Sequence, residues 1–155
     1  MTKKIYVVTG IPGAGKSHFI DSQLKEGSDI YVDLRELQQT HKDIIEAEYL
    51  FYAEIERYLR ETTNKNSRLI LETVLAKSFR RRALLRFFKT LAEGLQIEVE
   101  FHLILIHPSK NRYYENLRAR FPYRTSEGDL YERQLELYDS PSKEEGWDEV
   151  KIYCI

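Results

Sequence analysis

The stretch that most constrains the fold of this 155-residue chain is residues 5–18, IYVVTGIPGAGKSH. Apolar residues 5–8 are typical of a buried strand. The segment 10–17, GIPGAGKS, then fits the spacing G-x-x-x-x-G-K-[ST] of a phosphate-binding loop between a strand and a helix. Glycines let such a backbone approach phosphate oxygens, and the amides at the helix N-terminus favour an anion. The motif therefore predicts a nucleoside triphosphate site.

Two side chains of this loop carry the chemistry. Lys16 supplies a positive charge to the β- and γ-phosphates, and Ser17 offers a hydroxyl to a metal ion. We therefore expect ATP and Mg²⁺ as ligands, with Ser17 as the metal-binding residue. A glycine-rich turn without a ligand is the alternative, but the strand, the Lys–Ser pair and the helix all stand in register. The residues expected to hold the nucleotide are Gly10, Pro12, Gly13, Ala14, Gly15, Lys16, Ser17 and His18.

Length and composition favour one domain over residues 1–155. Hydrophobic residues make up 42% and charged residues 32%, which excludes a disordered chain. The net charge of −1 provides no general attraction for nucleic acid, so such contact needs a local basic patch. The single cysteine, Cys154, excludes an internal disulfide and a thiolate cluster. No apolar run reaches the length of a signal peptide or membrane span, so we expect a cytoplasmic protein without a membrane partner.

Hydrophobic periodicity predicts strands that alternate with helices. The strands are expected at 5–8, 30–32, 69–71, 99–106 and 150–155, and the main helices at 43–60, 78–93, 109–121 and 129–140. Gly27 and Gly94 are expected to cap helix C-termini, residues 62–67 to form a loop, and Ser126-x-x-Asp129 to form a capping box. This order predicts a three-layer α/β fold of the P-loop NTPase type, with a five-stranded parallel sheet and helices on both faces.

Polar residues follow the strands at their carboxyl ends, where open sheets of this kind bind ligands. Asp33 follows the second strand, Glu72 and Thr73 the third, and His107 the fourth. We expect strand 30–32 to lie beside the phosphate-loop strand, so that Asp33 faces the γ-phosphate and accepts the proton of an acceptor hydroxyl. A helix cap, or a magnesium ligand through water, is the alternative role for Asp33. Glu72 is the competing base, or it reaches Mg²⁺ through water.

Two helices carry features with more than one interpretation. The helix at 43–60 has a broad apolar stripe, within which Glu48 is interpreted as a carboxylate at the stripe edge rather than in a substrate cleft. The next helix carries consecutive arginines at 80–82, which we interpret mainly as a solvated face. The residues of the apolar stripe are Ile44, Ile45, Phe51, Tyr52, Ile55, Tyr58 and Leu59.

Several stretches together resemble the P-loop kinases similar to the 5′-kinase domain of phage polynucleotide kinases. GIPGAGKS resembles their loop G-x-P-G-x-G-K-S, and LILETVLAKSFRRRALLRFFK resembles their third strand, acidic–Thr pair and Arg-rich helix. VEFHLILIHP and the Arg-rich helix behind it resemble their fourth strand and lid, and ERQLELYDSP with EEGWDEV resembles the closing helix and strand. The resemblance covers nearly the whole chain, and only the loop motif is highly specific.

The resemblance implies an ATP-dependent transfer of the γ-phosphate to an acceptor hydroxyl, with the 5′-hydroxyl end of a polynucleotide favoured. It matches Asp33 with the acceptor-activating carboxylate, Arg35 with an arginine that grips an acceptor phosphate, and Arg120 or Arg118 with the lid arginine. Asp33 and Arg35 stand one residue closer than the family's Asp-x-x-Arg, and Glu72 stands where Asp is common. The implied catalytic set is Lys16, Asp33, Arg118 and Arg120, and the implied acceptor-binding set is Arg35, Glu72 and Thr73.

Two other functions stay open from the sequence. One is a kinase for a nucleotide or a small metabolite, because this fold serves many acceptors. The other is a nucleotide-binding switch or toxin-like protein that binds ATP without acceptor-stimulated turnover. The sequence leaves the acceptor, the choice between ATP and GTP, and the oligomeric state open.

Overall fold

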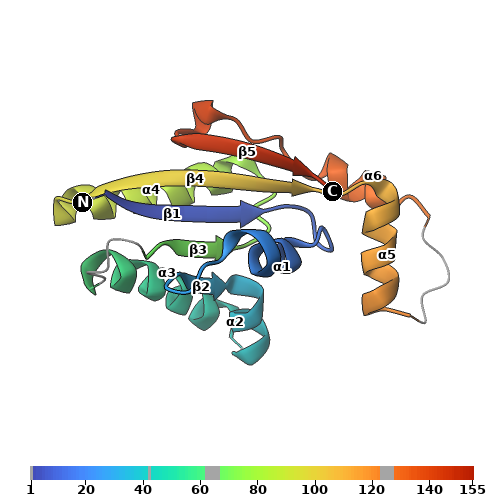
Figure 1. Ribbon diagram of the computed structural model, residues 1–155, viewed down its shortest axis with the longest axis horizontal. Coiled ribbons are helices and arrows are strands. Elements are labelled where there is room, and N and C mark those ends of the chain that lie inside the picture. The colour runs from blue at the N-terminus through green and yellow to red at the C-terminus, as the bar shows by residue number, and fades with distance from the viewer. Residues whose placement is uncertain (1, 42, 62–66, 123–127) are drawn as a thin grey trace.

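The computed structural model describes residues 2–41, 43–61, 67–122 and 128–155 (Figure 1). Most of the loop expected at 62–67, and Ser126 of the expected capping box, lie outside these residues. The strands are β1 (Thr2–Thr9), β2 (Ile30–Asp33), β3 (Leu69–Glu72), β4 (Glu98–His107) and β5 (Glu149–Cys154). The helices are α1 (Lys16–Phe19), the π-helix η1 (Ile20–Leu24), α2 (Leu34–Thr40), α3 (Ile44–Glu61), α4 (Ser78–Leu95), α5 (Lys110–Arg120), α6 (Leu130–Glu136) and the 3-10 helix η2 (Lys143–Glu145).

The five strands form one parallel sheet in the order β2-β3-β1-β4-β5, which confirms the predicted fold class. The expectation that the strand at 30–32 lies beside the phosphate-loop strand is wrong, because β3 occupies that place. All four residues of β3 are buried, whereas Val32 is the one buried residue of β2. The more apolar strand, β3, takes the interior position beside β1, and the less apolar strand, β2, becomes the edge.

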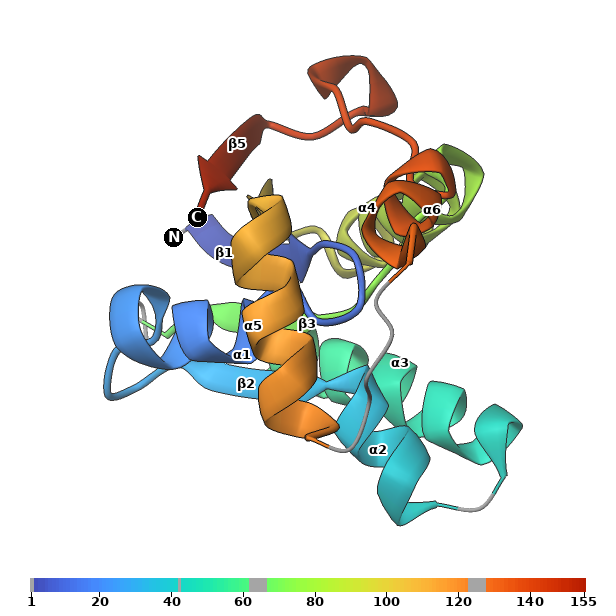
Figure 2. The ribbon, with the colours of Figure 1, turned by 90° about the vertical axis from the view of Figure 1, so that its right-hand side faces the viewer.

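Alternate residues of the strands build two cores, one on each face of the sheet. Ile5, Val7, Leu69 and Leu71 face α3 and α4, whose contribution includes Phe88. Residues of the opposite parity, including Val8, Ile70 and Ile104, face α1, η1 and α5. Figure 2 shows α1 on one side of the sheet and α3 and α4 on the other. Helices on both faces therefore cover the sheet, as the periodicity predicted.

The predicted apolar stripe of α3 is buried only in part. Phe51, Ile55, Tyr58 and Leu59 are buried, but Ile44 and Ile45 are 64% and 77% exposed. Burial along α3 begins at Ala47, so the first turn of the helix, which holds Ile44 and Ile45, lies outside the core.

Two expected glycine caps are also corrected. The first helix ends at Leu24 after the π-turn, and extended Lys25 follows it, so Gly27 lies in the next turn. Gly94 lies inside α4, and Gln96 takes the left-handed cap position with a φ of 56°. Among the described residues, no helix combines the length and the apolarity needed to cross a bilayer.

Candidate nucleotide and acceptor site

The predicted phosphate loop joins the carboxyl end of β1 to α1. Gly13 and Gly15 have φ values of 85° and 96°, a conformation that residues with a Cβ rarely adopt. A Cβ on Gly10 would lie 2.7 Å from the backbone oxygen of Ile106 in β4. Glycine is therefore required at Gly10 by close packing, and at the other two positions by backbone conformation.

Lys16 lies over this loop and donates hydrogen bonds to the backbone oxygens of Gly10 (3.1 Å) and Ile11 (3.2 Å). Burial lowers the pKa of Lys16 to about 8, and the charges of Glu72 and Asp33 oppose that shift. This desolvated ammonium lies above a loop whose backbone requires glycine at three positions. The arrangement is well suited to binding a polyphosphate.

Ser17 contacts Glu72 directly. Its hydroxyl donates to Oε1 at 2.8 Å and to Oε2 at 3.0 Å, and the Tyr31 hydroxyl donates to Oε2 at 3.1 Å. A hydroxyl and a carboxylate beside a phosphate loop are hard oxygen donors of the type that Mg²⁺ takes together with phosphate oxygens. Among the described residues, no cluster of three or more His, Cys, Asp or Glu side chains could hold a metal ion. A metal here would therefore depend on the nucleotide for its remaining ligands.

Asp33 and Glu72 lie opposite each other in the register of β2 and β3. Burial and the neighbouring Asp33 raise the pKa of Glu72 to about 7, while the hydrogen bond from Ser17 opposes the rise. Asp33 also accepts a 2.9 Å hydrogen bond from the amide of Arg35 and so caps α2. The helix-cap role considered from the sequence is therefore present, together with a place at the rim.

Two of the predicted arginines share the electrostatic field of this rim. Arg35 and Arg120 both act on the pKa of Lys16, and Glu72 acts on that of Arg120. Partial burial lowers the pKa of Arg120, and the charge of Arg35 lowers it further. Arg118 stands two residues earlier on α5, so its side chain leaves the helix about 200° away from that of Arg120. Arg120 therefore lies on the side of α5 that comes within electrostatic reach of Lys16 and Glu72.

Helix α5 packs across the phosphate loop, a contact that the sequence analysis missed (Figure 2). Asn116 donates from Nδ2 to the backbone oxygen of Gly13 at 2.9 Å, and the Tyr113 ring would lie 3.4 Å from a Cβ on Gly13. Residues 113, 116 and 120 share one face of the helix because they are spaced by three and four. That spacing could have selected Arg120 over Arg118.

The remaining predicted residues take varied positions. Thr73 is buried and its amide donates to the Val8 oxygen at 3.1 Å, whereas Pro12 and His18 are exposed. His107 is half-buried at the end of β4, and Ala14 is buried beneath the loop.

Two further predictions concern α3 and α4. Glu48 is exposed and its charge acts on nearby Tyr52, which agrees with the edge position favoured from the sequence. The solvated arginine run holds for Arg80 and Arg82, but it is wrong for Arg81, which is fully buried.

No protein-family model and no curated protein sequence matches this chain. Solved structures do match its fold. A gluconokinase from Sinorhizobium meliloti 1021 is 16% identical, with 99% of this chain and 82% of that chain covered and a TM-score of 0.56. A fungal RNA kinase is 13% identical, with coverage of 98% and 74% and a TM-score of 0.59. A chain of the PezAT toxin–antitoxin system of Streptococcus pneumoniae is 19% identical, with coverage of 99% and 67% and a TM-score of 0.62. At these identities the likeness is one of fold.

The pH dependence of folding reports on the buried Glu72 carboxyl. Its pKa is raised from an ordinary value near 4.5 to about 7, so between these values the folded protein holds a proton that the unfolded chain releases. The resulting stabilisation is complete below the unfolded pKa and is lost as the pH rises through 7. Relative to Glu72→Gln, we expect the wild-type protein to lose on the order of 2 kcal/mol between about pH 5 and 8, since one pKa unit is about 1.4 kcal/mol.

Urea unfolding of both proteins across this pH range measures the difference. Identical pH profiles for the two proteins would contradict a carboxyl whose pKa is raised by burial.

Proposed function

We propose that this protein is an ATP-dependent phosphotransferase that moves the γ-phosphate of ATP to an acceptor hydroxyl, namely the 5′-hydroxyl end of a polynucleotide. The observation that carries the proposal is the contact of Ser17 with both oxygens of Glu72, beside the loop that holds Lys16. The chain has the fold of P-loop kinases, and this contact adds hard oxygen donors where that fold binds phosphates.

Phosphoryl transfer needs in-line positioning and positive charge over the transferring group more than covalent help from the protein. The loop amides and Lys16 hold the β- and γ-phosphates, and Arg120 adds charge from the lid side of the rim. Ser17 and Glu72 would hold Mg²⁺, which supplies further positive charge to the phosphate oxygens when it is bound.

Glu72 and Asp33 have different roles because they lie at different distances from the phosphate loop. Glu72 ends the strand next to β1 and already contacts Ser17, so it serves the metal side. Asp33 ends the strand one position further out and serves the acceptor side. Its carboxylate accepts the hydrogen bond of the attacking hydroxyl, aligns the oxygen and takes its proton.

Aromatic and basic side chains beside this rim favour a polynucleotide acceptor. Phe79, in the first turn of α4, is 65% exposed, and the Arg80 guanidinium lies 5.8 Å from the centre of its ring. Tyr52 of α3 is 38% exposed, packs edge-on against Phe87 at 4.8 Å and lies within electrostatic reach of Arg80. Single-stranded nucleic acids stack bases on such rings and pair phosphates with arginine. The patch adds one exposed cation, Arg80, beside the aromatic rings, and Glu48 also lies within electrostatic reach of Tyr52.

Substitution of the two carboxylates tests their separate roles. We expect Asp33→Asn to lower the rate of transfer by roughly 10²–10⁴-fold, the loss typical of a positioned base, with little change in ATP affinity. Glu72→Gln should instead raise the Mg²⁺ concentration needed for half-maximal rate. Steady-state kinetics with Mg²⁺ titrations of both variants give the comparison. Normal turnover by Asp33→Asn beside an inactive Glu72→Gln would reverse the assignment.

An acceptor panel with γ-labelled ATP tests the substrate class. It should contain 5′-hydroxyl DNA and RNA oligonucleotides, nucleosides, nucleoside monophosphates and sugars. We expect label in oligonucleotides, with a shallow loss of activity as salt rises because few phosphates are held. Phe79→Ala and Arg80→Gln should raise the acceptor KM several-fold and leave the ATP KM unchanged. Arg82→Gln is the matched control, because Arg82 is also exposed on α4 but contacts the backbone of Glu144.

Other products would identify another function. Label only in sugars or mononucleotides would show a small-molecule kinase, a role compatible with the gluconokinase fold match. Tight ATP binding without turnover on any acceptor would show a nucleotide-binding switch or toxin-like protein, in line with the match to the PezAT system.

A further inference from the structure

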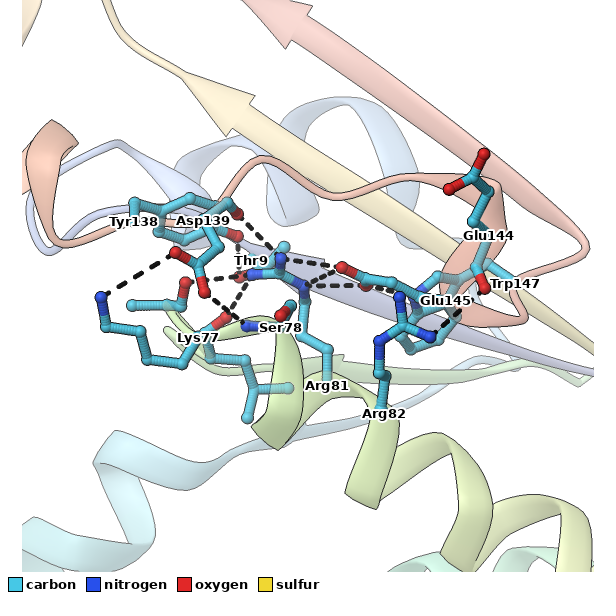
Figure 3. Close-up of polar contacts among 12 residues, drawn as sticks. Thr9, Lys77, Ser78, Arg81, Arg82, Tyr138, Asp139, Glu144, Glu145 and Trp147 are labelled. Atoms are coloured by element: carbon cyan, nitrogen blue, oxygen red, sulfur yellow. Dashed lines mark hydrogen bonds and ion pairs between the residues drawn. The ribbon is translucent and has the colours of Figure 1, made fainter.

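Arg81 lies at the centre of a buried hydrogen-bond network (Figure 3). Its side chain is 0% exposed, and each of its five N–H donors has an acceptor. Nε and Nη2 donate to the Glu145 carboxylate at 3.0 and 2.9 Å, and Nη2 also donates to the backbone oxygen of Asp139 at 2.8 Å. Nη1 donates to the backbone oxygens of Leu75 (2.9 Å) and Ala76 (3.2 Å). The guanidinium therefore joins α4, the β3–α4 loop, η2 and the segment after α6.

Stability alone is a weak reason for such a pair. Taking a guanidinium and a carboxylate out of water is costly, and well-packed apolar residues in their place often leave a protein equally stable. The Glu145 carboxylate is nevertheless held in place by a second donor, Trp147 Nε1 at 3.1 Å. The network therefore neutralises the guanidinium and also fixes its direction. That direction determines which backbone carbonyls the guanidinium holds.

The loop that Arg81 holds connects Glu72 of the proposed site to α4. Leu75 in this loop has a φ of 39°, a left-handed conformation that is strained for a bulky residue. Such strain persists only where the surroundings impose it, and it concentrates at functional sites. The imposing contacts are those of Arg81 with the two loop carbonyls, and the Asp139 amide, which donates to the Ala76 oxygen at 2.8 Å.

The same network reaches the phosphate loop through Thr9. The Arg81 guanidinium lies 5.3 Å from the centre of the Tyr138 ring, whose hydroxyl hydrogen-bonds the Thr9 hydroxyl at 2.6 Å. The Thr9 hydroxyl also donates to the backbone oxygen of Val74, and Gly10 follows Thr9 directly. Figure 3 shows Thr9, Tyr138 and Arg81 converging from three separate segments. The start of the phosphate loop and the β3–α4 loop are thereby tied to each other.

We propose that Arg81 is a positioning residue, which holds the β3–α4 loop at a fixed distance from the phosphate loop so that acceptor and nucleotide meet in line. This role rests on the proposed phosphotransfer. Arg81 does not contact either substrate in this scheme. It acts through Leu75 and Ala76 on the acceptor side, and through Tyr138 and Thr9 on the nucleotide side. The competing explanation is that the Arg81–Glu145 pair only attaches η2 to α4.

A double variant separates positioning from attachment. Arg81→Met with Glu145→Leu removes both charges and keeps apolar volume, so it avoids the cost of a single unpaired buried charge, although Trp147 Nε1 loses its acceptor. Urea unfolding establishes the conditions in which the variant is folded, and its kinetics are measured there. The loop carbonyls lose their donors all the same. We expect kcat/KM for the acceptor to fall about 10²-fold, the loss that a displacement near 1 Å causes, while the Kd for ADP changes less than about threefold. Arg82→Met is the matched control on the neighbouring exposed arginine and should retain wild-type kinetics.

Arg81→Lys gives a second, conservative comparison. It keeps the charge but cannot reach five acceptors in a fork, so turnover should fall by an intermediate factor. A double variant that regains native stability together with native kcat/KM would overturn the positioning role. So would an unstable Arg81→Lys whose residual folded fraction turns over at the native rate.

Limited proteolysis tests the tether, that is, the hold of Arg81 on the β3–α4 loop. This measurement does not require catalysis, so it remains informative if the proposed function fails. Lys77 lies in the β3–α4 loop, so a lysine-specific protease reports local opening by cleavage after Lys77. We expect the double variant to be cleaved there at least 10-fold faster than the wild-type protein or Arg82→Met, with cleavage after Lys110 unchanged. Equal cleavage rates would overturn the tether. Faster cleavage of the double variant, together with a wild-type protein that transfers no phosphate to any acceptor, would support the tether and refute the phosphotransfer.

Discussion

The burial of β3 between β1 and β2 is the constraint on which the rest of the site depends. Because all four residues of β3 are buried, its last residue, Glu72, ends beside the phosphate loop and within 3.0 Å of the Ser17 hydroxyl. The same placement moves Asp33 one strand outward, opposite Glu72 in register. The strand order thus separates the carboxylate that contacts Ser17 from a second carboxylate one strand further from the phosphate loop.

The rim combines positively and negatively charged side chains that are partly buried. Glu72, Asp33, Arg120 and Arg35 all lie within electrostatic reach of Lys16. Burial lowers the pKa of Lys16 to about 8 and raises that of Glu72 to about 7, so both groups are held where their charged forms are poorly solvated. A triphosphate with a divalent cation would supply partners to both, and perturbed groups of this kind concentrate at functional sites.

Local signals account for the parts of the structure that were predicted from sequence. The phosphate loop is encoded by adjacent residues, and the alternation of strands and helices follows from hydrophobic periodicity. The order of the strands cannot be predicted from local sequence, because the short apolar runs at 30–32 and 69–71 are similar. They differ in the folded protein, where β3 is more buried than β2. Ile44 and Ile45 fit the helical period, but the period carries no information about which turns of the helix have a packing partner.

The burial of Arg81 could have been predicted from its position in the helical period of α4. Consecutive residues of a helix point about 100° apart, so three arginines in a row cannot all face solvent equally. Arg81 shares its face with Leu84, Leu85, Phe88 and Ala92, the buried positions of α4, whereas Arg80 and Arg82 lie off it. The spacing predicts the burial of Arg81. Its partner Glu145 is 64 residues away, so the ion pair could not be predicted from the local sequence.

The central claim is that the phosphate loop binds ATP for transfer, and the most direct measurement compares γ-phosphate transfer by the wild-type protein and Lys16→Ala. Lys16 is the first residue of α1 and belongs to neither core, so the variant should fold with a urea midpoint close to that of the wild-type protein. Removal of one such electrostatic contact costs on the order of 10²-fold or more in rate. Lys151→Ala, on the exposed edge strand, is the control for loss of a lysine charge. We expect transfer by the wild-type protein and the control, and at least a 10²-fold loss in Lys16→Ala. Near-native turnover in Lys16→Ala would contradict it.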